Sequence, residues 1–378
     1  MHFEIRRKDF LRLMIASGAI ARADAQSRKP PAASKSEKFS QRVLQDNATA
    51  MLSMGAYMGD RLGIFRAMTV AGPSTLTDLA ARTGLNSIYL REWLGLMVTG
   101  NYVDYDPGST KYSLPPERAE VLVKEDSPVF MGGYLEFLAA LLVTPKVMEG
   151  FRGRKGPASD DYTAEFWESI ERSSAPVYKH VFTQSYLTAP EIVGHLRAGG
   201  SFLDLGCGGG LACLAVAKAY PKAEVYGFDV FAPSIDRARA NAKAAGLENR
   251  VHFETYDGVT LPARRFDVIT MCYSVHHMVD PVAVLASAKD ALRERGSVLI
   301  LEGKVSTKLE NNVSTLGNWL YGASLLYCAA SNLTDGGPAY GALINESDLR
   351  DLSRKAGFQT FRRLPIDSAI DALYEIRA

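Results

Sequence analysis

Residues 201–210, "SFLDLGCGGG", decide the fold of this chain. A short apolar run with one acidic residue leads directly into a turn that contains four glycines. A strand followed by a glycine turn is typical of parallel α/β sheets, which bind ligands at the carboxyl ends of their central strands. The stretch therefore predicts a ligand-binding turn at Gly206, Gly208 and Gly210.

From the strand that leads into this turn onward, apolar strands and helices alternate along the chain. The segments "AEVYGFDV", "VHFETYD", "FDVITMCYS" and "SVLILEG" have the character of buried strands, and helical patterns separate them, including "DPVAVLASAKDALRERG". Such alternation predicts an α/β fold, a doubly wound Rossmann-like sheet with helices on both faces. We place this domain at residues 196–378.

Two phosphate-binding explanations of the glycine turn fit poorly. A nucleoside-triphosphate loop needs a Lys-Ser/Thr pair after its glycines, whereas Leu211, Ala212 and Cys213 follow here. A dinucleotide turn has the spacing G-x-G-x-x-G, which these glycines match only weakly. A nicotinamide oxidoreductase therefore stays an alternative with little support.

Acidic residues near the ends of three successive strands favour a positively charged ligand over one that carries phosphate. Asp204 would repel a pyrophosphate in a cleft of low dielectric constant, but it would attract an ammonium or sulfonium group. S-adenosyl-L-methionine carries both groups and no phosphate. Asp229 is predicted to bind the ribose hydroxyls of this cofactor. Asp257, followed by Gly258, is predicted to accept a hydrogen bond from the adenine amino group.

The motifs "DLGCGGG", "GFD", "YDG" and "FDVITMCYSVHHMVDP" resemble those of class I S-adenosyl-L-methionine-dependent methyltransferases. From about residue 41 the chain resembles a bacterial group of small-molecule methyltransferases, O-methyltransferase-like, with an N-terminal winged-helix domain. This resemblance implies methyl transfer, S-adenosyl-L-homocysteine as a product, and a homodimer. It also implies a seven-stranded sheet that "FQTFRRLPI" and "DALYEIRA" close as an antiparallel pair.

Candidate catalytic residues follow the fourth strand of this sheet, at Tyr273, His276 and His277. The resemblance to O-methyltransferases of the caffeate type implies that His276 is the general base, although His277 and Met278 replace an Asp and a Trp of that family. A thiol acceptor needs a base less than a hydroxyl does, since a thiol has a pKa of about 8.5. Hydroxyl and thiol acceptors therefore both stay open, including a small-thiol or sulfide-specific enzyme.

An aromatic insertion, residues 306–345, is too long for a plain connector and is expected to cover the acceptor pocket. Asn318, Tyr321 and Tyr327 are candidate acceptor contacts, and Trp319 is expected to bury a lid helix. Glu302 could orient the base or face the cofactor. The sequence shows no cluster with metal-ligand spacing, so we expect metal-independent transfer.

The N-terminal half differs in character, with a winged-helix pattern over residues 75–114 inside a domain at 41–125, followed by helices at 126–195. Its second helix offers only Arg91 as a cation, and the chain as a whole is nearly neutral, with 43 Lys and Arg against 42 Asp and Glu. DNA binding needs a stronger positive field, so a packing or dimerisation role is favoured. A ligand-sensing, DNA-binding regulator remains the alternative.

The first 40 residues predict either a leader or an irregular extension. A basic head, an apolar stretch and A-x-A spacing resemble a secretory or twin-arginine-like leader. The methyl donor is made in the cytosol, so a cytoplasmic protein is expected, with export as the alternative. Residues 27–38 predict a linker, with the folded protein beginning near residue 40. "FMGGYLEFLAALLVTPKVMEGF" (130–151) predicts a buried helix and no membrane span.

Overall fold

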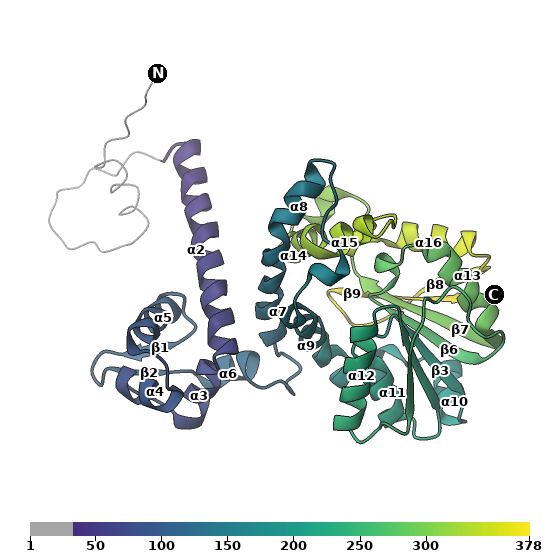
Figure 1. Cartoon of the computed structure of the whole chain (residues 1–378), viewed down its shortest axis with the longest axis horizontal. Coiled ribbons are helices and arrows are strands. Elements are labelled where there is room, and N and C mark those ends of the chain that lie inside the picture. Colours follow the sequence, from purple (N-terminus) through teal and green to yellow (C-terminus); the bar gives the residue numbers. More distant parts are fainter. Residues whose placement is uncertain (1–32) are drawn as a thin grey trace. The chain divides into compact units, whose positions relative to one another are not determined.

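The computed structural model describes residues 33–378, which form two compact units that divide between Arg118 and Ala119. Figure 1 shows the elements of each unit. None of the helices in the described part of the chain combines the length and the apolar composition that a membrane span requires. The leader predicted for the first residues lies outside the part of the chain that the structure describes.

The first unit is a winged helix that follows a long helix. Its elements are α2 (Lys35–Arg61), α3 (Ile64–Ala71), α4 (Leu76–Thr83), α5 (Ser87–Thr99) and the hairpin of β1 (Asp104–Asp106) with β2 (Lys111–Ser113). Trp93 of α5 contacts the ring of Phe65 edge-on and donates its indole N–H to the carbonyl of Gly55. These contacts join the second helix of the predicted winged-helix pattern to α2 and α3.

Helix α2 begins earlier than predicted. Ser34 accepts the N–H of Glu37, and the Glu37 carboxylate accepts the N–H of Ser34. This capping box satisfies two N–H groups that a helix start otherwise leaves open. The linker predicted over residues 27–38 is therefore wrong from Lys35 onward.

Helix α6 (Pro116–Leu122) contains the division between the two units. The second unit continues with a series of helices: α7 (Gly132–Glu136), η1 (Phe137–Val143), α8 (Thr144–Phe151), η2 (Ser159–Asp161), α9 (Ala164–His180), η3 (Phe182–Tyr186) and α10 (Pro190–Arg197). The segment 130–151, predicted as a buried helix that ends at Pro145, is a run of three short helices, in which Leu142 and Phe151 are exposed. Pro145 has no backbone N–H to donate, so it suits the first turn of a new helix rather than the interior of a long one.

The sheet of the second unit has seven strands in the order β5-β4-β3-β6-β7-β9-β8. They are β3 (Ser201–Leu205), β4 (Glu224–Asp229), β5 (Val251–Thr255), β6 (Phe266–Cys272), β7 (Leu292–Gly303), β8 (Thr360–Leu364) and β9 (Asp371–Arg377). The first five are parallel, and β9 pairs antiparallel with both β7 and β8. The doubly wound, seven-stranded prediction with its closing antiparallel pair is confirmed.

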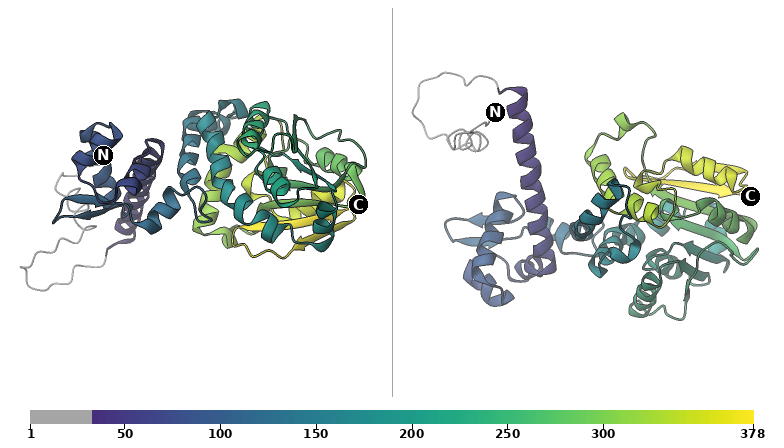
Figure 2. Two further views of the ribbon diagram at one scale, coloured as in Figure 1. Left: turned by 90° about the horizontal axis from the view of Figure 1, so that it is seen from below. Right: turned by 45° about the horizontal axis from the view of Figure 1, so that its top comes forward.

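Helices cover both faces of this sheet (Figure 2). Phe202 lies in the core with α10, α11 (Leu211–Ala219) and α12 (Ala232–Ala244). The next residue, Leu203, lies in the opposite core with α13 (Pro281–Ala291) and α16 (Glu346–Lys355). This alternation follows the two-residue period of a strand and places Asp204 on the same face as Phe202.

Two segments near the site differ in detail from the sequence-based expectation. The helix predicted to end near Gly296 ends at Ala291, because Leu292 already pairs with Phe266 in the ladder and an irregularity follows. The 306–345 insertion is mostly helical. Its elements are η5 (Leu309–Asn312), α14 (Thr315–Ala323), the π-helix η6 (Ser324–Cys328), α15 (Ala329–Thr334) and η7 (Gly341–Leu343).

Candidate functional site

The glycine turn between β3 and α11 requires glycine for its backbone shape. Gly206, Gly208 and Gly210 have φ angles of 79°, 52° and 77°, in the left-handed region that disfavours side chains. The N–H groups of Gly206 and Cys207 both donate to the carbonyl of Phe228 on β4. The turn is therefore fixed to the end of the neighbouring strand.

Asp229 lies at the tip of β4, beside this turn. Its carboxylate accepts the N–H of Gly208 and the N–H of Phe231, both at 2.9 Å. Burial raises the pKa of Asp229, and the two backbone donors act in the opposite direction. A carboxylate has about four acceptor positions, so Asp229 keeps capacity for two further donors such as vicinal hydroxyls.

Asp204 is buried inside β3. Its Oδ1 accepts the hydroxyl of Thr270 at 2.7 Å, and the side chain is almost inaccessible to solvent. Burial raises the pKa of Asp204 to about 7. Since an opposite charge favours the ionised form of a carboxyl group, a cation close to Asp204 would lower that pKa again.

A third carboxylate, Glu171 of α9, reaches the same turn. Its Oε1 accepts the amide N–H of Asn241 at 2.8 Å, and Asn241 also donates to the carbonyl of Gly209. A side chain at Gly209 would overlap with the Glu171 carboxylate. Burial raises the pKa of Glu171. The sequence analysis missed this residue because no local motif marks one glutamate of an amphipathic helix as a neighbour of the turn.

Asp257 has a local role in the structure. It is exposed, and its Oδ1 accepts the N–H of Val259 at 3.0 Å within its own turn. Gly258 is buried with a φ of 76°. The predicted contact between Asp257 and adenine stays a prediction.

His276 and Glu302 form a buried pair. His276 lies in η4 (Val275–His277), after β6, and its Nδ1 is 2.7 Å from Oε2 of Glu302 at the end of β7. Burial of the imidazole lowers the pKa of His276, but the Glu302 carboxylate and Cys328 outweigh it and raise that pKa to about 10. This contact is the geometry that the orienting role of Glu302 requires, and the role itself stays a prediction.

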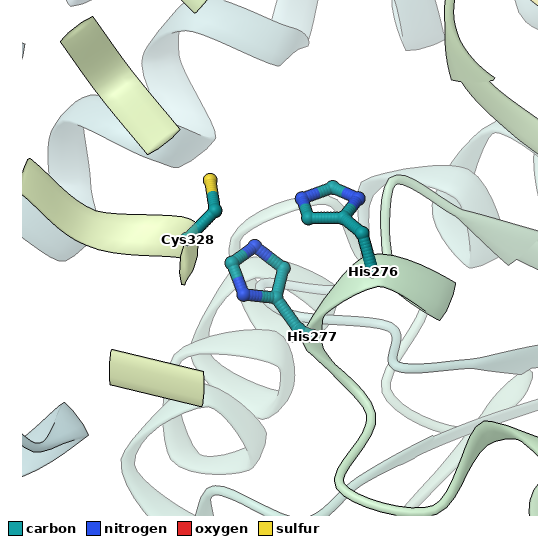
Figure 3. A group of neighbouring side chains, drawn as sticks. All are labelled: His276, His277 and Cys328. Carbon is teal, nitrogen blue, oxygen red and sulfur yellow. The ribbon is translucent and has the colours of Figure 1, made fainter. Parts of the chain in front are cut away.

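Two further side chains lie beside His276. The nearest side-chain nitrogen or sulfur atoms of His276, His277 and Cys328 all lie within 4.8 Å of one another. Figure 3 shows the three side chains, with Cys328 contributed by the helical insertion. The histidine rings are 4.1 Å apart, and burial lowers the pKa of His277. The sequence revealed no such cluster because Cys328 is distant along the chain.

The Tyr273 hydroxyl donates to Oδ1 of Asp371 at 2.6 Å, and the Tyr186 hydroxyl donates to Oδ2 of the same carboxylate at 2.6 Å. Burial and the nearby Asp371 raise the pKa of Tyr273. Its φ of 52° is unusual for a tyrosine. Because its proton is held by a carboxylate, Tyr273 is better placed to position its neighbours than to exchange a proton. The sequence analysis missed Asp371.

The residues predicted in the insertion separate into two sets. Tyr327 is buried, with its ring 4.7 Å from that of His277 and 5.1 Å from that of Tyr162. Asn318 and Tyr321 are exposed on α14. The predicted burial of Trp319 is only partial, since its ring contacts Tyr134 and Phe137 but is 37% exposed.

Comparisons with known proteins agree with this architecture. Residues 196–336 match a family described as a methyltransferase domain, and residues 50–124 match a family described as an Rv2258c-like winged HTH domain. The predicted methyltransferase fold behind an N-terminal winged helix is thereby confirmed.

Two sequence relatives carry names of O-methyltransferase type. The chain is 30% identical over 161 residues, 43% of its own length, to a ubiquinone biosynthesis O-methyltransferase of Cereibacter sphaeroides (strain ATCC 17025 / ATH 2.4.3). It is 36% identical over 107 residues, 28% of its length, to a 27-O-demethylrifamycin SV methyltransferase of Amycolatopsis mediterranei (strain S699). These matches span 61% and 39% of the two relatives.

Solved structures resemble nearly the whole chain in fold. A mitomycin 7-O-methyltransferase aligns with a TM-score of 0.67 and 20% identity, covering 91% of this chain and 98% of its own. Human N-acetylserotonin methyltransferase, solved in complex with S-adenosylmethionine, aligns with a TM-score of 0.64 and 17% identity, covering 93% and 100%.

Proposed function

We propose that this chain is an S-adenosyl-L-methionine-dependent methyltransferase that acts on a hydroxyl or thiol group of a small molecule. The observation that carries this proposal is the set of carboxylates at the glycine turn, formed by Asp204, Asp229 and Glu171. They disfavour a pyrophosphate and favour a cationic nucleoside. The names of the sequence relatives support a hydroxyl acceptor over a thiol.

In this proposal the cofactor lies along the ends of β3, β4 and β5. Asp229 accepts the two ribose hydroxyls, and Asp257 with Gly258 lies at the adenine. The turn of Gly206, Gly208 and Gly210 allows the backbone to approach the cofactor closely. Asp204 supplies negative charge for the cationic methionine portion. Glu171, whose Oε2 lies 3.4 Å from Nε of Arg237 and is partly balanced by it, is a weaker second source of such charge.

His276 is the proposed general base, and Glu302 orients it. With Nδ1 held by Glu302, Nε2 is the ring nitrogen that can take the acceptor proton. Because Glu302 and Cys328 raise the pKa of His276 to about 10, the transfer uses the fraction of the protein in which Nε2 is neutral, and this fraction grows as the pH rises. As the proton moves to Nε2, the acceptor oxygen forms a bond to the methyl carbon and the carbon–sulfur bond breaks. S-adenosyl-L-homocysteine then leaves as a neutral thioether, and Glu302 stabilises the imidazolium that remains.

The other predicted residues have supporting roles. Tyr273 positions the segment before the base through Asp371, and His277 lies beside the base. Tyr327 is proposed as an apolar wall for the acceptor, with Asn318 and Tyr321 as contacts of its outer part. Such walls exclude water, which raises the strength of the electrostatic interactions inside.

We also propose that the protein is a homodimer that operates in the cytoplasm, where its methyl donor is made. Apolar side chains recur at three- and four-residue steps on α2, where Phe39 is 69% exposed and Met51 is 61% exposed, with Val43 and Leu44 between them. An exposed apolar stripe of this kind is typical of a protein interface. On α5 the exposed Arg91 is paired with Glu92, which gives the DNA-binding alternative no support.

The test is a transfer assay with methyl-labelled S-adenosylmethionine and a panel of small phenols, alcohols and thiols. We expect label in at least one acceptor and a stoichiometric amount of S-adenosylhomocysteine. Binding of the cofactor with no transfer to any member of the panel would contradict the acceptor class. Failure to bind the cofactor at all would contradict the proposal as a whole.

A further inference from the structure

The cluster of His276, His277 and Cys328 has the composition of a transition-metal site. Two imidazoles and a thiol are ligands that Zn²⁺ prefers. In a tetrahedral zinc site, ligand atoms are roughly 3.3 to 3.5 Å apart. The ligand atoms of the three side chains lie within 4.8 Å of one another, so they would have to approach by up to about 1.5 Å to reach this spacing.

The orientation of His276 suits a metal ligand. Its Nδ1 is bound to Glu302, which leaves Nε2 for the other side of the ring. Metal-binding histidines commonly have their second nitrogen held by a carboxylate in this way, which fixes the ring and strengthens the ligand. In Figure 3 one nitrogen of each histidine faces the space between the three side chains.

The backbone around the cluster is held in place by a buried amide. Asn332 of α15 donates to the carbonyls of His277 and Met278 and accepts the N–H of Ala339. Cys328 ends the π-helix η6, directly before α15. Asn332 therefore ties the histidine segment to the segment that carries the thiol. Such fixed support is what a metal site requires, and π-helical turns are frequent at functional sites.

We propose that His276, His277 and Cys328 bind one Zn²⁺ ion through three protein ligands and leave a fourth position open for water or the acceptor. This departs from the expectation of metal-independent transfer. Three ligands with an open position are the arrangement of catalytic rather than structural zinc. Because Nε2 of His276 cannot hold a metal and a proton together, the loaded site ionises the acceptor by coordination, and the proton goes to solvent.

Metal binding by the full chain tests this proposal without cofactor or acceptor, so its failure is distinguishable from failure of the proposed transfer. Protein freed of metal by a chelator is titrated with Zn²⁺ in competition with a chromogenic chelator. We expect one ion per chain, and a loss of affinity of about 10-fold or more in Cys328→Ser and in His277→Gln. Co²⁺ should give tetrahedral visible bands and a sulfur-to-metal band that Cys328→Ser abolishes.

Cys213→Ala is the matched control, since Cys213 is another buried free cysteine, on α11 and outside the cluster. It should bind Zn²⁺ as the unmodified chain does. Binding of less than one ion per chain would overturn the proposal. So would equal affinity of the unmodified chain and both ligand variants, with circular dichroism used to confirm that each variant is folded.

Discussion

The cofactor end of the candidate site and its acceptor end are built in different ways. At the cofactor end, Gly208, Asp229 and Phe231 are joined by hydrogen bonds between neighbouring strand tips. At the acceptor end, His276 meets Glu302 from β7 and Cys328 from the insertion. The first end depends on backbone geometry, and the second depends on side chains that tertiary packing brings together. Substitutions at the two ends should therefore affect different steps.

The largest effect is expected at the acceptor end. His276→Ala should slow transfer to a hydroxyl acceptor by about 10²- to 10⁴-fold, because it removes the proposed base. Affinity for S-adenosylhomocysteine should stay unchanged, since His276 does not lie at the glycine turn. Single-turnover kinetics together with calorimetric titration would measure both quantities. An equal loss in transfer and in cofactor affinity would show that the two ends are not separable.

Asp229→Asn tests the cofactor end. It should weaken the binding of S-adenosylmethionine by roughly 10- to 100-fold, which corresponds to the loss of one or two charge-assisted hydrogen bonds. Asp351→Asn is the matched control, since Asp351 is an exposed aspartate of α16 that pairs with Arg354 outside the proposed site, and it should change affinity far less. Equal effects of the two substitutions in calorimetric titrations would mean that the ribose lies elsewhere.

The pH dependence of cofactor binding follows from Asp204. Its pKa is raised to about 7 in the free protein, so the group is mostly neutral below that pH and mostly ionised above it. A cationic cofactor favours the ionised form, so affinity should rise several-fold from pH 6 to pH 8. Asp204→Asn should flatten this dependence. A slope that persists in the variant would assign the titration to another group.

The raised pKa of Asp204 also predicts how the free energy of unfolding depends on pH. Because the folded-state pKa of Asp204 lies above the unfolded value, the folded state binds the proton more tightly. The contribution of Asp204 to stability is therefore fully present below about pH 4 and is lost as the pH rises to about 7. Thermal unfolding should show that S-adenosylhomocysteine raises Tm more at pH 8 than at pH 6, and Asp204→Asn should reduce the difference.

A smaller effect, on stability rather than on transfer or cofactor binding, is expected from a substitution at Gly209. Gly209→Ala places a methyl group against the Glu171 carboxylate and should lower the free energy of unfolding by about 1 to 3 kcal/mol. Glu171→Ala should relieve part of this cost in the double variant. Denaturant unfolding of the four proteins in the cycle measures the coupling. Simple additivity of the two substitutions would show that Glu171 does not confine the turn.

Most of the sheet and its glycine turn could be predicted, because strand alternation and the spacing of Gly206, Gly208 and Asp229 are local features of the sequence. The sequence allowed the pairing of His276 with Glu302 to be predicted only as one of two possible roles for Glu302. Glu171, Cys328 and Asp371 could not be predicted, since each reaches the site from an element whose position depends on tertiary packing. The early start of α2 was missed although its capping box was visible at Ser34.

The most direct test of the central claim is calorimetric titration of the full chain with S-adenosylmethionine, and separately with NAD. The carboxylates around the glycine turn predict binding of one S-adenosylmethionine per chain and no binding of NAD. Binding of NAD without binding of S-adenosylmethionine would contradict the assignment of this site to a cationic cofactor that lacks phosphate.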